Sequence, residues 1–159
     1  MTTTGSGEWV MLAYRLPREP STPRIALWRR LKRLGVVQVV DGLVALPADR
    51  RTREQLEWAA EEVSQAGGFA SLWTAKPAAA ADERALRERM TKSVSDDYEL
   101  VIAAARAADA KDPAARRRTL KQLRRTQNAI ALRDYFPTPK REEARDAVER
   151  LAQTVEVTH

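Results

Sequence analysis

The basic side chains of arginine and lysine cluster in one part of this sequence. Residues 111–136 contain eight basic and two acidic side chains, against totals of 28 and 22 in all 159 residues. On a helix, four of the basic residues fall at positions i, i+4, i+7 and i+8, and so share one face. They are Arg117, Lys121, Arg124 and Arg125. Such a face can lie along phosphates, and we predict nucleic-acid binding there. The alternative is a solvated face with acidic partners in residues 82–99.

Arg15 and Arg24 form a second candidate site. Arg15 ends an apolar stretch typical of a buried strand, so its guanidinium needs a partner or access to the surface. One interpretation is an ion pair with a carboxylate such as Asp134. The other is an anion-binding site in which Arg15 and Arg24 hold a tetrahedral oxyanion, together with N–H groups of a helix that begins near Thr22.

Residue types used in catalysis and in metal binding are scarce. The sequence has no cysteine, and its one histidine is His159, at the end of the chain. Disulfides, thiolate metal sites and cysteine nucleophiles are therefore excluded. The acidic clusters have no companion histidine or glycine loop, and we interpret them as solvent-facing or helix-dipole residues. They are Asp96-Asp97 with Glu99, Glu61-Glu62 and Glu142-Glu143. We expect no enzyme activity, no cofactor and no metal site.

Apolar segments in the first half predict the elements that position these side chains. Residues 9–16 are typical of a buried strand, and a helix follows with Ser21 or Thr22 as its cap and Gly35 at its end. Residues 36–40 and 43–46 then predict a hairpin. Its turn is Asp41-Gly42, which favours a type I′ turn with positive φ at both residues.

A second helix and a fourth strand complete this half. Thr52 with Gln55 predicts a capping box, and Gly67-Gly68 ends the helix before a strand at residues 69–74. The order βαββαβ predicts a ferredoxin-like α+β sandwich, with two helices on one face of an antiparallel sheet. We expect Trp28, Trp58 and Trp73 in its core, with Trp58 the most exposed of the three.

The second half is predicted to be entirely helical. Apolar residues recur every three or four positions from Leu86 to Ala108, a break follows at Lys111-Asp112-Pro113, and further helices cover residues 114–136 and the stretch after Pro139. We therefore predict a disordered tail at residues 1–7, a sheet domain at 8–77 and a helical extension at 78–159. The extension should pack on the sheet domain or on a second subunit.

Charge and hydropathy limit the partners. The net charge is +6 and the isoelectric point is about 10.0, which allows an anionic partner without identifying it. No apolar run approaches the roughly 20 residues of a membrane span. We expect a cytoplasmic protein.

Several short motifs occur in an informative order. They are Tyr14-Arg15 within residues 9–17, Leu27-Trp28-Arg29 within 24–35, the Asp41-Gly42 hairpin ending in Leu46-Pro47, Asp97-Tyr98-Glu99-Leu100, Arg133-Asp134-Tyr135-Phe136 and Arg141-Glu142-Glu143-Ala144. Over about residues 8–151 this set resembles the N-terminal domain of the ChrB-type chromate resistance proteins. The resemblance implies a chromate-responsive regulator of an efflux operon. As partners we expect chromate or another oxyanion, DNA, and a second copy of the chain in a homodimer.

The first strand and helix also resemble the ferredoxin-like domain of CRISPR-associated nucleases and of phenylacetate-type repressors. Those nucleases hold a metal with an aspartate at the end of the first strand, where this sequence has Tyr14-Arg15-Leu16. An arginine there removes the ligand and adds like charge, which disfavours nuclease activity. The alternatives to a regulator are a stand-alone protein-interaction domain and a degenerate nucleic-acid-processing fold of the CRISPR-associated type.

Overall fold

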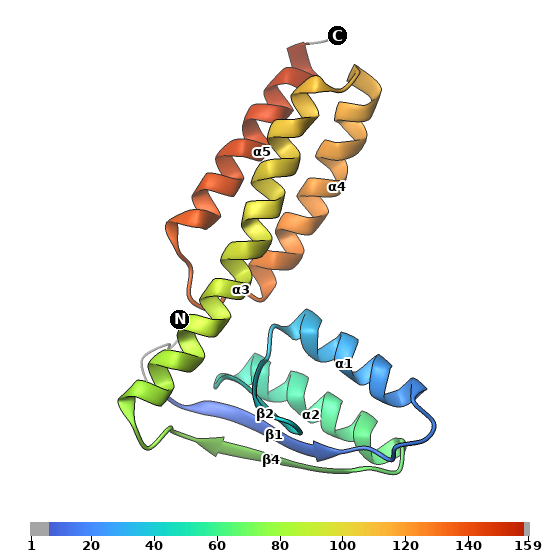
Figure 1. The fold of residues 1–159 in the computed structure, drawn as a ribbon, viewed down its shortest axis with the longest axis vertical. Helices are drawn as coiled ribbons and strands as arrows, with labels where there is room; N and C mark the ends of the chain where they lie inside the picture. Colours follow the sequence, from blue (N-terminus) through green and yellow to red (C-terminus); the bar gives the residue numbers. More distant parts are fainter. Residues whose placement is uncertain (1–6, 158–159) are drawn as a thin grey trace. The chain divides into compact units, whose positions relative to one another are not determined.

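The computed structural model describes residues 7–157, and its chain divides into two compact units (Figure 1). One unit extends up to Arg89 and the other begins at Met90. Residues 1–6 of the predicted disordered tail lie outside the described residues, as His159 does. Among residues 7–157 no helix is both long enough and apolar enough to cross a membrane.

The first unit is a four-stranded sheet with two helices on one face (Figure 1). Its elements are β1 (Trp9–Arg15), α1 (Thr22–Leu34), β2 (Val37–Val40), β3 (Leu43–Pro47), α2 (Arg50–Gln65) and β4 (Phe69–Ala75). The strand order is β2-β3-β1-β4, and every neighbouring pair is antiparallel. This arrangement confirms the predicted ferredoxin-like α+β sandwich.

Alternation along the strands produces the core of this unit. Val10 and Leu12 of β1 are buried, and Arg15 at the end of the strand is exposed. The helices contribute apolar side chains that are at most 1% exposed, namely Leu27, Leu31, Leu56, Ala59 and Val63. Because each helix buries one stripe only, the basic residues of α1 and the charged residues of α2 remain on the outer side.

The hairpin between β2 and β3 differs from the predicted turn. Gly42 has a φ of 77°, but no described residue other than glycine has a positive φ, so Asp41 does not adopt the type I′ conformation. A register shift between Gln38 and Val40 interrupts the pairing of β2 with β3. The prediction of a type I′ turn was wrong, because Gly42 alone provides the left-handed residue and a β-bulge accompanies the turn.

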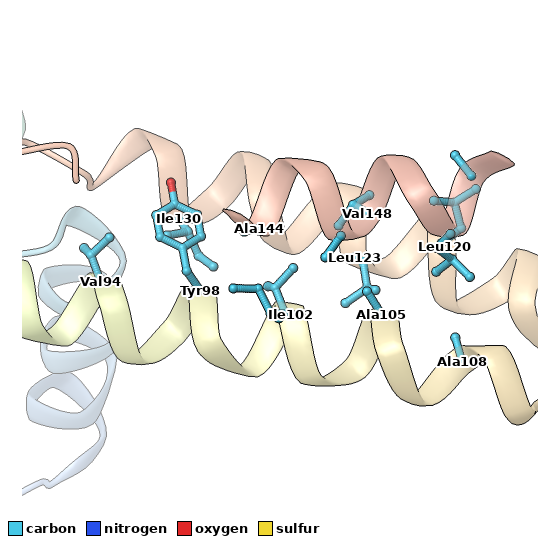
Figure 2. Close-up of a cluster of buried hydrophobic side chains, with 14 residues drawn as sticks. Val94, Tyr98, Ile102, Ala105, Ala108, Leu120, Leu123, Ile130, Ala144 and Val148 are labelled. Carbon is cyan, nitrogen blue, oxygen red and sulfur yellow. The ribbon is translucent and has the colours of Figure 1, made fainter. Parts of the chain in front are cut away.

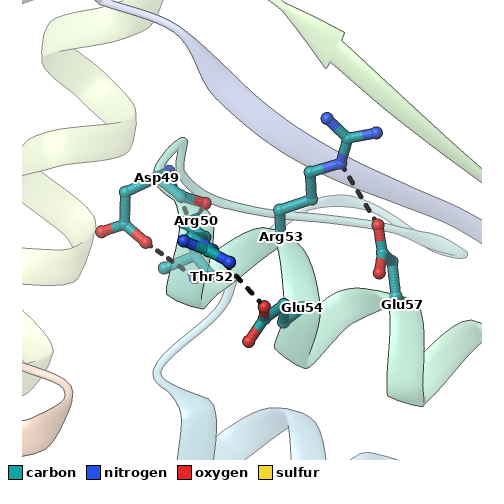
Figure 3. A network of polar contacts seen from close by, with 6 residues as sticks. All are labelled: Asp49, Arg50, Thr52, Arg53, Glu54 and Glu57. Carbon is teal, nitrogen blue, oxygen red and sulfur yellow. Dashed lines mark hydrogen bonds and ion pairs between the residues drawn. The ribbon is translucent and has the colours of Figure 1, made fainter.

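Helix α2 begins three residues earlier than predicted. Its cap is Asp49, whose Oδ1 accepts from the Thr52 backbone N–H at 2.7 Å, while the Asp49 N–H donates to Thr52 Oγ1 at 3.0 Å (Figure 3). Thr52 was predicted as the cap, with Gln55 as its partner, and is instead the third residue of the helix. Buried Thr52 also donates to the carbonyl oxygen of Pro47 at 2.7 Å. The carboxylate of Asp49 is the better acceptor at this position, which explains the error.

The tryptophans are more exposed than the sequence predicts. Trp28 is 38% exposed, Trp73 61% and Trp58 68%, so the prediction of core positions was wrong, although Trp58 is the most exposed of the three. Leu27 and Leu31 fill the inner side of α1 without Trp28. Trp73 pairs with Met11 of β1 and alternates with Leu72 and Thr74, so it lies on the opposite face of β4 from those two residues.

The second unit is helical, as predicted. Helix α3 (Ala80–Ala107) runs across the division between the units and ends in a short 3₁₀ turn (Ala108–Ala110). It is followed by α4 (Pro113–Leu132) and α5 (Pro139–Val157). Helix α4 stops four residues before the predicted end at Phe136. Side chains from α3, α4 and α5 meet in one buried cluster around Tyr98, Ile102, Leu123, Ile130 and Val148 (Figure 2).

Candidate functional site

Helix α4 carries the predicted basic face. Pro113 occupies its first turn, and the Asp112 carboxylate accepts from the Ala115 N–H at 2.8 Å, which fixes the start of the helix. Leu120, Leu123 and Ile130 are buried on the inner side. Burial of this apolar stripe sets the rotation of α4, and the residues at i, i+4, i+7 and i+8 are therefore held on its exposed side.

The four predicted side chains lie around one shallow hollow. Its lining consists of Arg117, Leu120, Lys121, Arg124, Arg125 and Asn128. Asn128 was not predicted, although it continues the spacing at i+11 from Arg117 and adds a hydrogen-bonding amide among the cations. The structure thus brings together every residue of the predicted nucleic-acid-binding set.

Three acidic residues in the second half of α3 form ion pairs with other cations. Lys92 pairs with Asp96 at 2.8 Å, Arg133 pairs with Asp97 at 2.8 Å, and Lys140 contacts Glu99. Within residues 7–157 no ion pair joins Arg117, Lys121, Arg124 or Arg125 to a carboxylate. None of the ion pairs among the described residues therefore engages these four cations, and they are available to an anionic partner.

The two arginines of the predicted anion site lie on different elements. Arg15 is the exposed last residue of β1, and it lines a hollow with Ala13, Tyr14, Asp41, Gly42 and Phe69. Burial, followed by the charge of Asp41, raises the pKa of Tyr14 in this hollow. Arg24 is exposed in the first turn of α1 and is not among the lining residues. That turn has no acidic residue, and the side chain of Ser21 does not cap it. Anion binding by Arg15 and Arg24 stays a prediction, as does the ion pair between Arg15 and Asp134.

Two of the sequence motifs meet in the helical unit. The buried Tyr98 hydroxyl donates to Asp134 Oδ2 at 3.3 Å, next to the Arg133–Asp97 pair. Both contacts join residues 36 positions apart, so they tie α3 to the segment after α4. Asp97 was expected to face solvent, whereas it is half-buried and paired. These residues position the start of α5 relative to α3 and α4, which is a structural role.

Lys140 of α5 adds a further contact to α3, beside the Tyr98–Asp134 and Arg133–Asp97 pairs. Its ammonium group contacts Glu99 and lies 2.9 Å from a carboxylate oxygen of Glu143. Hydrogen bonds to Glu99 and then to Glu143 raise the pKa of Lys140, so the cation is favoured in the folded state.

We expect the free energy of unfolding of the helical unit to depend on pH through Asp134, which contacts Tyr98. Burial raises the pKa of its carboxyl, and the hydrogen bond from Tyr98 and the charge of Arg141 oppose that effect. A raised folded-state pKa favours the protonated form, so this stability is present below the unfolded pKa and is lost as pH rises through the folded pKa. Asp134→Asn keeps an acceptor oxygen for Tyr98 but cannot ionise.

The free energy of unfolding of Asp134→Asn, relative to the unchanged protein, should therefore increase between about pH 3 and about pH 7. Urea denaturation at several pH values measures this difference. Asp146→Asn, on the exposed side of α5, is the control and should show no such trend. A difference that falls as pH rises would contradict the assignment.

Comparison with known proteins gives three findings. The family model described as "Protein ChrB, N-terminal" matches residues 24–111. The curated Protein ChrB of Cupriavidus metallidurans is 31% identical over 134 residues, which are 81% of this chain and 40% of that protein. This chain therefore spans less than half the length of that relative.

The third finding is a solved structure, the uncharacterized protein Rv0674 from Mycobacterium tuberculosis. It matches with a TM-score of 0.53 and 18% identity, over 96% of this chain and 63% of the other. At this identity the match shows a shared fold and nothing about activity.

Proposed function

The chain belongs to the ChrB N-terminal family of chromate resistance proteins, and from this membership we propose a non-catalytic regulatory module that contacts DNA through the basic face of α4. The observation that carries the proposal is the set of cations around the α4 hollow, Arg117, Lys121, Arg124 and Arg125. A cytoplasmic location follows from contact with DNA. Chromate or another oxyanion would be the effector, with Arg15 and Arg24 as its candidate ligands.

The chemistry of the α4 face favours phosphate over base recognition. Its cations are exposed on one helical side, and no aromatic residue lines the hollow. Arginine and lysine contacts to phosphate are independent of sequence and weaken with salt. We therefore expect this chain to bind DNA with modest affinity and little sequence preference, and with a steep dependence on salt.

Neutralising three of these cations tests the proposal. The triple variant Arg117→Gln, Lys121→Gln and Arg124→Gln should bind a labelled duplex roughly 100-fold more weakly near 100 mM salt. The slope of log K against log salt should become shallower by about 2.7, because each phosphate contact contributes about 0.9. Fluorescence anisotropy over a salt series measures both quantities.

A matched control separates a site from a general effect of charge. Arg29→Gln, Lys32→Gln and Arg33→Gln remove the same charge from exposed positions of α1, and this variant should keep most of the affinity and slope. Equal weakening by both triple variants would indicate non-specific attraction. Unchanged binding by the α4 variant would leave α4 as a solvated face and favour a protein-interaction domain. Cleavage of DNA or RNA that depends on a divalent metal would instead support the CRISPR-associated alternative.

A further inference from the structure

The two edges of the sheet are protected unequally. At one edge, β2 has four residues and is interrupted by the register shift between Gln38 and Val40. The Gln38 carbonyl oxygen on this strand accepts from Arg89 Nη2 at 2.6 Å. A short strand, a bulge and a side chain bonded to its backbone all discourage pairing with another chain.

The opposite edge, β4, has none of these features. All seven of its residues pair with β1, and no other described strand pairs with its outer side. Its sequence, FASLWTA, contains no charged residue and no proline. Phe69 and Trp73 are 62% and 61% exposed. An apolar edge strand of this length offers unpaired backbone N–H and C=O groups, and is a template for pairing.

A groove runs beside this edge, between β4 and α2. Leu72, Trp73 and Thr74 line it from the strand, and its helical side consists of Arg53, Glu57, Ala60, Glu61 and Ser64. The indole N–H of Trp73 donates to Ser71 Oγ at 2.9 Å, which holds the exposed ring in one orientation along the strand. An edge strand beside a groove is the arrangement to which an extended segment adds as a further strand.

We propose that the segment is β4 of a second copy of this chain, paired antiparallel across a two-fold axis near Leu72. This register places Trp73 opposite Ser71 and Phe69 opposite Ala75, so each large aromatic ring meets a small side chain. The Trp73 rings of the two copies become diagonal neighbours on the same face, within reach of each other. The two sheets would join into one sheet, and both unprotected edges would disappear.

Arg53 and Glu61 of α2 would form two complementary pairs across the same axis. Arg53 also lies 3.2 Å from Glu57 of its own helix, and this pair offsets the charge of Glu57 where it faces its own copy. Arg53 and Glu61 lie four residues before and after Glu57, on the side of the helix that lines the groove. A two-fold axis beside Glu57 reverses the direction of the second α2, and Arg53 of one copy then faces Glu61 of the other. Both contacts occur twice, which favours a second copy of this chain over an unrelated strand.

Sedimentation equilibrium of the full chain tests this interface, with the dissociation constant as the readout. Trp73→Lys should weaken the dimer at least 30-fold, because it places two cations near the axis. Trp58→Lys introduces the same residue at an exposed tryptophan of α2 outside the groove and should leave the dimer unchanged. Circular dichroism of each variant verifies that it is folded.

A charge exchange identifies the partner as a second copy. Arg53→Glu and Glu61→Arg should each weaken the dimer roughly tenfold, and the double variant should restore it. Arg53→Glu also removes the ion pair with Glu57 of its own helix. Arg50→Glu is the matched control, because it removes the equivalent i,i+4 pair with Glu54 at a position outside the groove. A wild-type chain that is still monomeric at about 100 μM would overturn the proposal, because this concentration is well above the micromolar dissociation constant of a weak specific dimer. A dimer unaffected by Trp73→Lys, or no recovery in the double exchange, would also overturn it. The readout is independent of DNA binding, so this inference and the proposed function can fail separately.

Discussion

Replacing Gly68 with alanine is expected to destabilise the sheet unit by about 3 kcal/mol, at the upper end of the usual cost of overpacking. A Cβ at this position would lie 2.3 Å from the carbonyl oxygen of Arg15, 2.9 Å from Val63 Cγ1 and 3.1 Å from Leu16 Cδ2. The nearest of these atoms belongs to the backbone and cannot rotate away. To remove the clash between this Cβ and the Arg15 carbonyl oxygen, β4 would have to move away from the end of β1, where Arg15 pairs with Phe69.

The neighbouring glycine provides the control for this prediction. Gly67 has a φ of 83°, but a Cβ there would meet only Pro17 Cγ at 4.0 Å. Gly67→Ala therefore pays for the left-handed backbone alone, about 1–2 kcal/mol. All four tryptophans, Trp9, Trp28, Trp58 and Trp73, lie in the sheet unit, so denaturation followed by tryptophan fluorescence reports on this unit. Equal losses in the two variants would show that the close approach at Gly68 is not important for stability.

Local sequence patterns were sufficient to predict most of the fold. The alternation in β1, the apolar spacing in α1 and α2, and Gly35 after α1 each depend on residues close together in the chain. The errors occur where two local solutions compete. Asp49 and Thr52 are both good helix caps, and only the structure shows that they cap reciprocally. Asp41-Gly42 is compatible with several turns, and the bulge in β2 decides among them.

The candidate site was predictable in position but not in electrostatic context. Spacing along one helix was enough to place Arg117, Lys121 and Arg124 on one face. Whether acidic residues of α3 neutralise them depends on contacts between distant segments. Arg133 forms an ion pair with Asp97, and Lys140 forms one with Glu99. Neither pair can be predicted from spacing along one helix. The burial of Tyr98 against Asp134 likewise depends on a contact across 36 positions.

The tryptophans show why residue type is a weak guide to burial. Trp28 and Trp73 are large and apolar, yet the core of a small sandwich is filled by Leu12, Leu27 and Leu31. Trp73 alternates along β4 with Leu72, which pairs with buried Leu12, so the two side chains leave the strand on opposite faces. The exposure of both residues is thus a property of the packing, and that of Trp73 favours a partner at the β4 edge.

Replacing Ile130 with alanine is expected to destabilise the helical unit by about 3 kcal/mol, within the usual range for a buried aliphatic side chain. Ile130 is fully buried in the cluster formed by α3, α4 and α5 (Figure 2). The variant loses both the transfer free energy of the removed methyl and methylene groups and the contacts around the resulting cavity. Small domains have stabilities of only about 5–15 kcal/mol, so this loss is a large fraction of the total.

Leu132→Ala, two residues along the same helix, separates packing from helix propensity. Leu132 is 64% exposed, so its replacement should change the free energy of unfolding by less than about 0.5 kcal/mol. Chemical denaturation followed by far-ultraviolet circular dichroism measures both variants. Because no tryptophan lies beyond residue 90, fluorescence in the same samples monitors the sheet unit. A loss at Ile130 no greater than that at Leu132 would contradict the assignment of Ile130 to the core, and with it the orientation of α4 that exposes the basic face.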